Sequence, residues 1–109
     1  MIMIHNPPNM TYPDDAFERA RMVIGDRWKA SIIQVLFDGP KSLMQIRTSI
    51  RQIFHKVLVS DLLELEQLGI ITKQMISKIP TEQEYCLTEK GYALFGIFEE
   101  MLKWAEQYH

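Results

Sequence analysis

Residues 42–71 carry the sequence SLMQIRTSIRQIFHKVLVSDLLELEQLGII. Ser42 is a favourable N-cap for a short helix over 43–50. A longer helix is predicted over 54–68, because apolar residues recur there at helical spacing. The expected core stripe of this helix is Val57, Leu58, Leu62, Leu65 and Leu68. Gly69 is expected to end it, since glycine favours the position just past a last turn. The stretch therefore predicts two consecutive helices joined by a tight connection.

A β-hairpin is predicted immediately after these helices. Residues 70–76 are rich in strand-forming side chains, and 77–81 form a turn that contains Pro80. In 83–87, Tyr85 and Leu87 alternate with Glu84 and Cys86, as expected for a strand with two different faces. Cys86 is expected to fill a small site on this strand.

Three further helices are predicted around this unit. The first starts at Asp14-Asp15, with an apolar stripe at Ala16, Phe17, Ala20 and Ile24. The second is capped by Asp26 and ends before Asp38-Gly39-Pro40; its apolar positions are Trp28, Ile32, Val35 and Leu36. The last starts at Thr88. Residues 1–13 hold three prolines and are expected to form an extended arm, so that 14–109 make up one domain.

The predicted order is four helices, a hairpin and a final helix. We therefore expect a mainly α fold with a small β-hairpin wing, the winged helix-turn-helix. In that motif the second helix of the pair enters the major groove and the wing lies on the DNA backbone.

Composition excludes several other classes of protein. The chain has 109 residues, a formal charge of −2 and a single cysteine. These numbers exclude a polybasic coat for nucleic acid and a disulfide framework within the chain. No apolar run is long enough to span a membrane, and the N-terminus lacks the features of a signal peptide. We therefore expect a cytoplasmic protein that does not bind membranes.

Charge is distributed unevenly along the chain. Residues 41–80 carry a formal charge of +3, and the rest of the chain carries −5. This asymmetry has the sign expected for DNA binding by the helix pair and hairpin. The candidate DNA-binding residues are Arg47, Arg51, His55, Lys56, Val59, Ser60, Lys73 and Lys78. Arg47 and Arg51 are expected to anchor the DNA backbone, and Lys73 and Lys78 belong to the wing.

Two residues of the 54–68 helix leave alternatives open. Asp61 could accept a hydrogen bond from a cytosine amino group, or it could pair with a neighbouring Lys or Arg. Leu63 either packs on the hairpin, or it lies on a face that meets protein rather than DNA.

The last helix carries an apolar seam. Its apolar residues recur at spacings of four, three, four and three, which favours helix–helix packing. A lone chain of this size cannot cover so long a seam, so we predict a homodimer. The candidate interface residues are Phe17, Leu94, Phe98, Met101, Trp104, Ala105 and Tyr108.

Catalysis and cofactor binding are not expected. His5, His55 and His109 lack metal-ligand spacing, and the glycines form no phosphate-binding loop. We therefore predict a protein that is not an enzyme and binds no cofactor.

Four blocks of sequence resemble one known family. They are Ile24-Gly25-Asp26-Arg27-Trp28, Leu36-Phe37-Asp38-Gly39-Pro40, Leu63-Glu64-Leu65-Glu66-Gln67-Leu68-Gly69-Ile70-Ile71 and Glu84-Tyr85-Cys86-Leu87-Thr88-Glu89-Lys90-Gly91. In order and spacing they resemble the HxlR-type winged-helix regulators of bacteria, relatives of the MarR type. The resemblance implies a homodimer, joined by its first and last helices, that regulates transcription from a palindromic operator. We expect a repressor.

The chain departs from the family's pattern at three places. Asp15 stands where redox-sensing members have a cysteine. Val59, Asp61 and Leu63 replace polar and basic residues of the recognition helix. In the wing, Lys73-Gln74 and Gln83 stand where paired arginines are common. Two alternatives therefore remain: a winged helix that binds protein through Val59 and Leu63, or a sensor of an unidentified small-molecule effector at the dimer seam.

Overall fold

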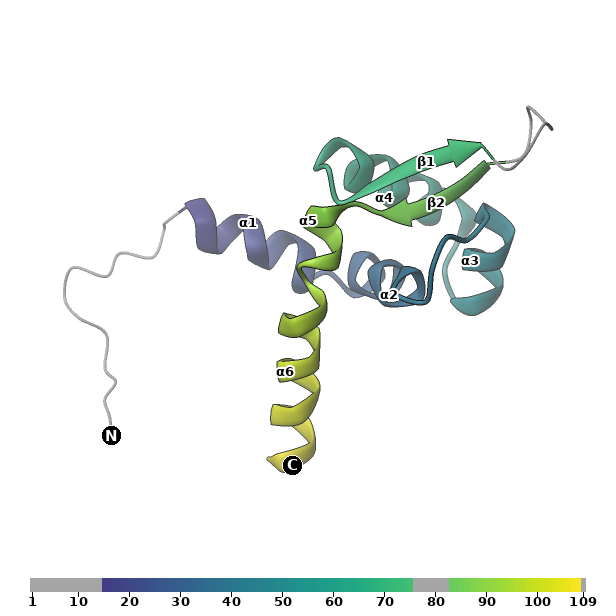
Figure 1. Cartoon of the computed structure of the whole chain (residues 1–109). Coiled ribbons are helices and arrows are strands. Elements are labelled where there is room, and N and C mark those ends of the chain that lie inside the picture. The colour runs from purple at the N-terminus through teal and green to yellow at the C-terminus, as the bar shows by residue number, and fades with distance from the viewer. Residues whose placement is uncertain (1–14, 76–82, 109) are drawn as a thin grey trace.

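The computed structural model describes residues 15–75 and 83–108. The predicted arm over 1–13, Asp14, the turn over 77–81 and Lys78 lie outside these residues. Figure 1 shows a helical unit with a hairpin on one side and two helices, the first and the last, that project from it. The elements are α1 (Asp15–Ile24), α2 (Arg27–Leu36), α3 (Leu43–Ser49), α4 (His55–Gln67), β1 (Ile71–Met75), β2 (Gln83–Leu87), α5 (Glu89–Tyr92) and α6 (Phe95–Gln107). This order confirms the predicted fold class.

The helix boundaries follow the capping signals in the sequence. The Asp26 carboxylate accepts hydrogen bonds from the backbone amides of Trp28 and Lys29 at the start of α2. Ser42 and Gln45 form a reciprocal capping box at the start of α3. Gly69 follows α4 with a φ of +76°, a conformation that glycine adopts without strain. These three predictions of helix ends are confirmed.

The hairpin is antiparallel and short. Its register runs from Ile71 opposite Leu87 to Met75 opposite Gln83. Lys41, just before α3, exchanges two backbone hydrogen bonds with Tyr85, of 3.0 and 2.7 Å. The wing is thereby attached to the segment that leads into α3.

The core lies between α2, α3, α4 and the hairpin. Its most deeply buried side chains are Ile32, Ile33, Leu36, Ile46, Leu58, Leu62, Leu65 and Ile71. The predicted stripe of α4 is wrong at Leu68, which is 41% exposed because it caps the helix beyond the last turn that packs on the core. In α1, Val23 is the buried residue, while Phe17 of the predicted apolar stripe is 57% exposed, as a residue proposed for an interface between two copies would be in one chain.

The last predicted helix is two helices. α5 ends at Tyr92, and the Leu94 amide bonds to the Gly91 carbonyl three residues back, at 3.0 Å, before α6 begins. This tighter turn separates the two axes. Gly91 is buried against the start of β1, where an added Cβ would collide with the carbonyl oxygen of Ile70.

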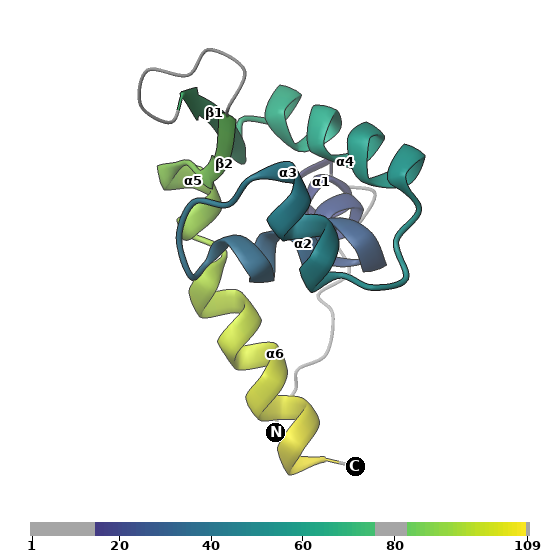
Figure 2. The ribbon, with the colours of Figure 1, turned by 90° about the vertical axis from the view of Figure 1, so that its right-hand side faces the viewer.

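α6 leaves the body of the molecule after its first turn. Near its start, the rings of Phe95 and Phe98 pack edge-on against Phe37, at centroid distances of 5.1 and 5.6 Å. Beyond that contact α6 extends away from the domain, as the two views in Figures 1 and 2 show. All thirteen residues of α6 are described, and none of them is buried. Within the described ranges, the helices are too short or too polar to cross a membrane.

Candidate DNA-binding interface

α4 presents one complete face to solvent. This helix lies along an edge of the domain (Figure 2). The exposed residues on its outer side include the candidates His55, Lys56, Val59 and Ser60, together with Leu63 and Gln67. Lys56, Val59 and Leu63 are three and four residues apart, so they follow one line along the helix. Leu63 is 54% exposed and is not covered by the hairpin.

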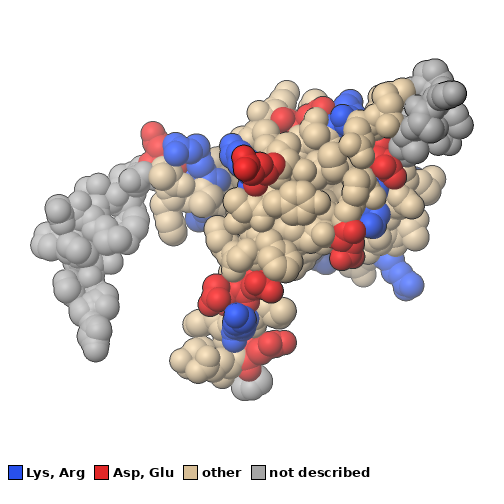
Figure 3. Space-filling view, in the orientation of Figure 1, with Lys and Arg blue, Asp and Glu red and all other residues tan. Residues whose placement is uncertain are grey.

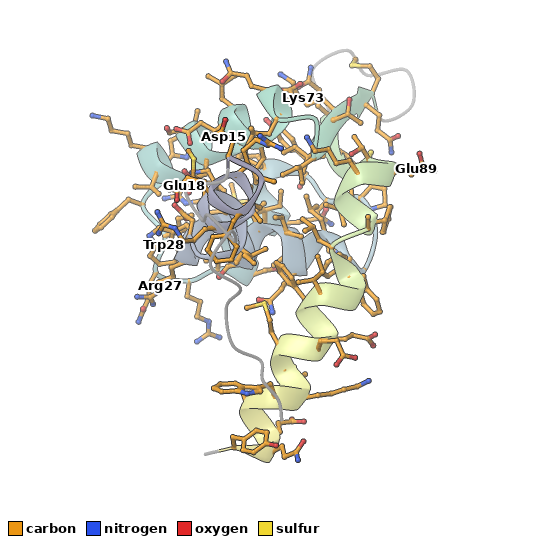
Figure 4. All side chains as sticks on the ribbon, turned by 90° about the vertical axis from the view of Figure 1, so that its left-hand side faces the viewer. Asp15, Glu18, Arg27, Trp28, Lys73 and Glu89 are labelled. Carbon is orange, nitrogen blue, oxygen red and sulfur yellow. The ribbon has the colours of Figure 1, made fainter. Side chains whose placement is uncertain are left out.

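The three acidic side chains of α4 are all paired with lysines. The Lys29 ammonium on α2 lies 3.3 Å from Asp61 Oδ1 and 2.8 Å from Glu64 Oε1. Lys73 on β1, labelled in Figure 4, lies 3.9 Å from Glu66 Oε1. Asp61 is buried, and its partner comes from another helix. Of the two alternatives for Asp61, the structure therefore shows the ion pair.

Lys29 is the centre of this charge network. It is buried at 9% exposure, and its ammonium also contacts Asp26 Oδ2 at 3.5 Å. Burial by itself would lower the pKa of Lys29. Its hydrogen bond to Glu64 and the charges of Asp61 and Asp26 outweigh that effect and raise the pKa above its ordinary value. The ammonium therefore stays charged at neutral pH.

The two aspartates of the network respond differently to their surroundings. Burial raises the pKa of Asp61, and the charge of Lys29 only partly offsets this effect. For Asp26, burial also acts upward, but the Lys29 backbone amide and the Lys29 charge outweigh it, so the pKa of this carboxyl is lowered. Lys29 consequently supplies the positive charge that balances the buried carboxylate of Asp61 on α4.

Sequence reasoning missed Lys29, although a signal for it was present. Lys29, Ile33 and Leu36 are spaced by four and three, so the lysine lies on the inward face of α2. A cation within an apolar stripe is rarely buried without partners. Its position therefore indicated a buried ion pair, but it could not show that the partners come from α4.

The basic candidates lie around the connection between α3 and α4. Arg47 on α3, Arg51 in the following connection and Lys56 on α4 are all exposed. Arg27 was not among the predicted residues. Its guanidinium donates to Gln52 Oε1 at 3.4 Å and lies 4.5 Å from the centre of the Trp28 ring, which places it beside the connection between α3 and α4. Figure 4 shows Arg27 and Trp28 next to each other.

Charge on the face seen in Figure 3 is mixed rather than gathered in one patch. In the view of Figure 3, basic and acidic side chains alternate over the described surface. The chain as a whole carries −2. Any attraction for a polyanion therefore comes from the local cations around α3 and α4, not from net charge.

The predicted dimer residues lie mostly on projecting, solvent-exposed surfaces. Phe17, Met101, Trp104 and Tyr108 are 57%, 47%, 65% and 58% exposed, and Ala105 is exposed as well. Leu94 and Phe98 differ from these, because they are half-buried against the chain's own core. An open, shallow apolar surface runs along one side of α6 and is formed by Ala93, Gly96, Ile97, Glu100, Met101, Trp104 and Ala105.

A helix pair that presents one open helix face, followed by a two-stranded wing, defines a winged-helix DNA-binding protein. Residues 23–109 match the model of the HxlR-like helix-turn-helix family. The chain belongs to this family, whose relatives are DNA-binding transcriptional regulators and not enzymes.

Individual relatives agree with this assignment. The chain is 44% identical over 91 residues to the HTH-type transcriptional regulator YodB of Bacillus subtilis, covering 84% of this chain and 81% of YodB. The structure of reduced YodB superposes with a TM-score of 0.80 at 42% identity, covering 91% of this chain and 95% of YodB. YodB has also been solved with bound quinone (TM-score 0.77, 41% identity, 86% and 99% covered). A MarR-family regulator from Enterococcus faecalis gives 0.78 at 27% identity, with 94% of both chains covered.

Proposed function

We propose that the protein is a homodimeric repressor that binds a palindromic operator with α4 in the major groove and the wing on the backbone. The observation that carries this proposal is the outer face of α4, where the helix's own acids are paired with Lys29 and Lys73. The face is thus open to DNA without uncompensated negative charge. Such a repressor acts in the cytoplasm, by occupying the operator and excluding polymerase.

Phosphate contacts in this proposal come from the basic residues around α3 and α4. Arg47 and Arg51 flank the connection between the two helices, and Lys56 lies in the first turn of α4. Lys73 lies on β1 of the wing, Lys78 is expected to contribute from the sequence alone, and Arg27 adds a cation beside the connection. His55 and Ser60 lie on the outer face of α4, where they can reach base edges.

The homodimer is supported by α1 and α6. Both project from the body of the molecule, and both expose large apolar side chains. A second copy that covers Phe17, Met101, Trp104 and Tyr108 would remove apolar surface from water at about 25 cal/mol per Å². In such a dimer, the α4 helices of the two subunits are expected to lie about one DNA turn apart, ~34 Å.

Removal of one cation tests the DNA-binding part. We expect Arg51→Ala to weaken binding to all duplexes similarly and to flatten the slope of log K against log salt by about one unit for each Arg51 on a phosphate. The measurement is fluorescence anisotropy with labelled duplexes over a series of salt concentrations. Lys103→Ala, which removes a charge from α6, is the matched control and should leave the slope unchanged. An unchanged slope for Arg51→Ala would exclude a phosphate contact.

A small-molecule effector is the second candidate partner, on a specific observation. A cavity of about 170 Å³ lies between α1, the end of α4 and α5, lined by Arg19, Ala20, Val23, Leu68, Ile70, Lys90 and Leu94. Its lining is apolar except for two cations, and the Lys90 ammonium is held by the Leu68 carbonyl at 2.7 Å. Because YodB has been solved with bound quinone, small ring compounds, quinones included, are the class of ligand to test. A thermal-shift screen of small aromatic compounds checks this, because a ligand of the folded state raises the midpoint.

A further inference from the structure

Two large apolar side chains occupy the middle of the face that α4 presents to DNA. Val59 is 45% exposed and Leu63 is 54% exposed. They lie on one line with Lys56, while the core side of the helix is filled by Leu58, Leu62 and Leu65. Neither side chain is needed to close the core, so their exposure requires another explanation.

The charges around these side chains favour a nucleic acid as the occupant. Lys56 lies at one end of the line and Arg51 just before the helix, and both are exposed. The acids that would repel phosphate are paired with Lys29 and Lys73. The pair also adds only a small area to the surface, whereas a stable protein partner buries about 800 Å² on each side.

The major groove offers one apolar group to such a surface. Thymine carries a C5-methyl there, while the other groups on the base edges are hydrogen-bond donors and acceptors. The line from Lys56 to Leu63 spans about 10 Å of helix, which corresponds to about three base-pair steps. Two adjacent aliphatic side chains on that line can therefore contact the methyls of successive or alternate base pairs.

We propose that Val59 and Leu63 are specificity-determining residues that recognise thymine methyl groups, so that the operator half-site is rich in thymine at the positions facing α4. This inference rests on the proposed function, because it needs α4 in the major groove. Lys56 supplies the polar contact at the N-terminal end of the same line, and Val59 and Leu63 supply discrimination without hydrogen bonds.

The test starts from a selection. A random 30-bp duplex library is selected on the full-length protein, and the winning duplex is remade with deoxyuridine in place of thymidine. Uracil keeps base pairing and all hydrogen-bond groups and lacks only the methyl. We expect the affinity to fall about fourfold for each thymine methyl that Val59 or Leu63 contacts. This factor corresponds to the transfer free energy of one buried methylene-sized group, about 0.8 kcal/mol. Anisotropy measures both duplexes at one salt concentration.

Variants separate the methyl contacts from general DNA binding. Val59→Ala and Leu63→Ala change exposed positions and should leave the fold intact. Together they should remove most of the difference between the thymine and uracil duplexes. Met44→Ala removes a side chain that is 65% exposed on α3 and should keep the full difference.

Two kinds of result overturn the proposal, and they are distinguishable. If the protein selects a duplex but binds its uracil version equally well, or if the double variant still discriminates, the inference is wrong and the proposed function stands. If no duplex is bound even at low salt, the proposed function fails along with the inference. In that case the apolar line on α4 is reassigned to a protein partner.

Discussion

α4 and α6 are helices of the same length with opposite surroundings. Each has thirteen residues, but α4 buries Leu58, Asp61, Leu62 and Leu65, whereas α6 buries none of its residues. The orientation of α4 is thus determined within one chain, by core contacts and by a charge network. The direction of α6 is determined only at its start, where it packs on Phe37. α4 is thus part of the hydrophobic core of a single chain, whereas α6 carries apolar surface that a single chain does not cover.

The largest effect is expected on the α4 side, from Lys29→Met. This change leaves Asp61 as a buried carboxylate without a cation, which costs about 3–5 kcal/mol of unfolding free energy. Urea unfolding followed by circular dichroism measures the loss. Lys103→Met is the matched control, because it removes an exposed pair with Glu100 and should cost less than about 1 kcal/mol. A loss below about 1 kcal/mol for Lys29→Met would contradict the role given to the network.

The same variant has a defined pH dependence. Burial raises the pKa of Asp61 in the folded state, and loss of Lys29 should raise it further. A folded state that holds a proton more tightly than the unfolded state becomes more stable as pH falls. The deficit of Lys29→Met relative to the original protein should therefore shrink between pH 7 and pH 5. A deficit that stays constant over this range would show that Asp61 is not the stranded group.

The next effect is expected on α6, from Met101→Glu. In one chain this side chain is 47% exposed, so the fold should be nearly unaffected. In a dimer the new carboxylate would be buried without a partner, which should weaken association by about 2 kcal/mol or more. Sedimentation velocity over a concentration series checks the assembly, and circular dichroism checks the fold.

Lys103→Glu is the control for this change. It introduces a carboxylate two residues away, on the other side of the same helix, and should leave association unchanged. A Met101→Glu protein that remains a dimer at low concentration would exclude the apolar surface of α6 as the interface.

The smallest effect is expected at the start of α2, from Asp26→Ala. The loss of two amide caps should cost about 1 kcal/mol. Because the pKa of Asp26 is lowered in the folded state, its contribution is present above the ordinary carboxyl pKa and is lost as pH falls through the folded value. The difference between the two proteins should therefore disappear in acid. Ser42→Ala removes a neutral cap of similar value and should show no such dependence.

Local signals in the sequence predicted local structure correctly. Asp26, Ser42 and Gly69 mark helix ends because each acts on backbone groups within a few residues. The apolar period predicted the core of α4 except at Leu68, where the helix had already ended. The break between α5 and α6 was missed, because the apolar spacing over 94–108 begins only after α5 has ended and carries no information about the turn at 93–94.

The charge network around Lys29 could not be predicted from sequence periodicity. Lys29 and Asp61 are 32 residues apart, and no period connects them. Only the packing of α2 against α4 brings the two side chains together. The candidate DNA-binding residues were predicted as a set from their place in the motif, and that set lacked Arg27, whose position beside Gln52 depends on the same packing.

Gly91 has a consequence for the geometry of the proposed dimer. It lets α5 lie directly against Ile70, just before β1, and α6 follows α5 after two residues, so this contact contributes, together with the packing on Phe37, to the angle at which α6 leaves the domain. α6 is about 20 Å long, so a rotation of about 10° at its base moves its far end by about 3.5 Å, close to the rise of one base pair. In a dimer joined through α6, a small change of angle at this buried glycine would therefore displace the partner subunit by several ångströms. The spacing between operator half-sites that such a dimer can bind then depends on the contact between Gly91 and Ile70, which lies away from the face of α4 that contacts the DNA.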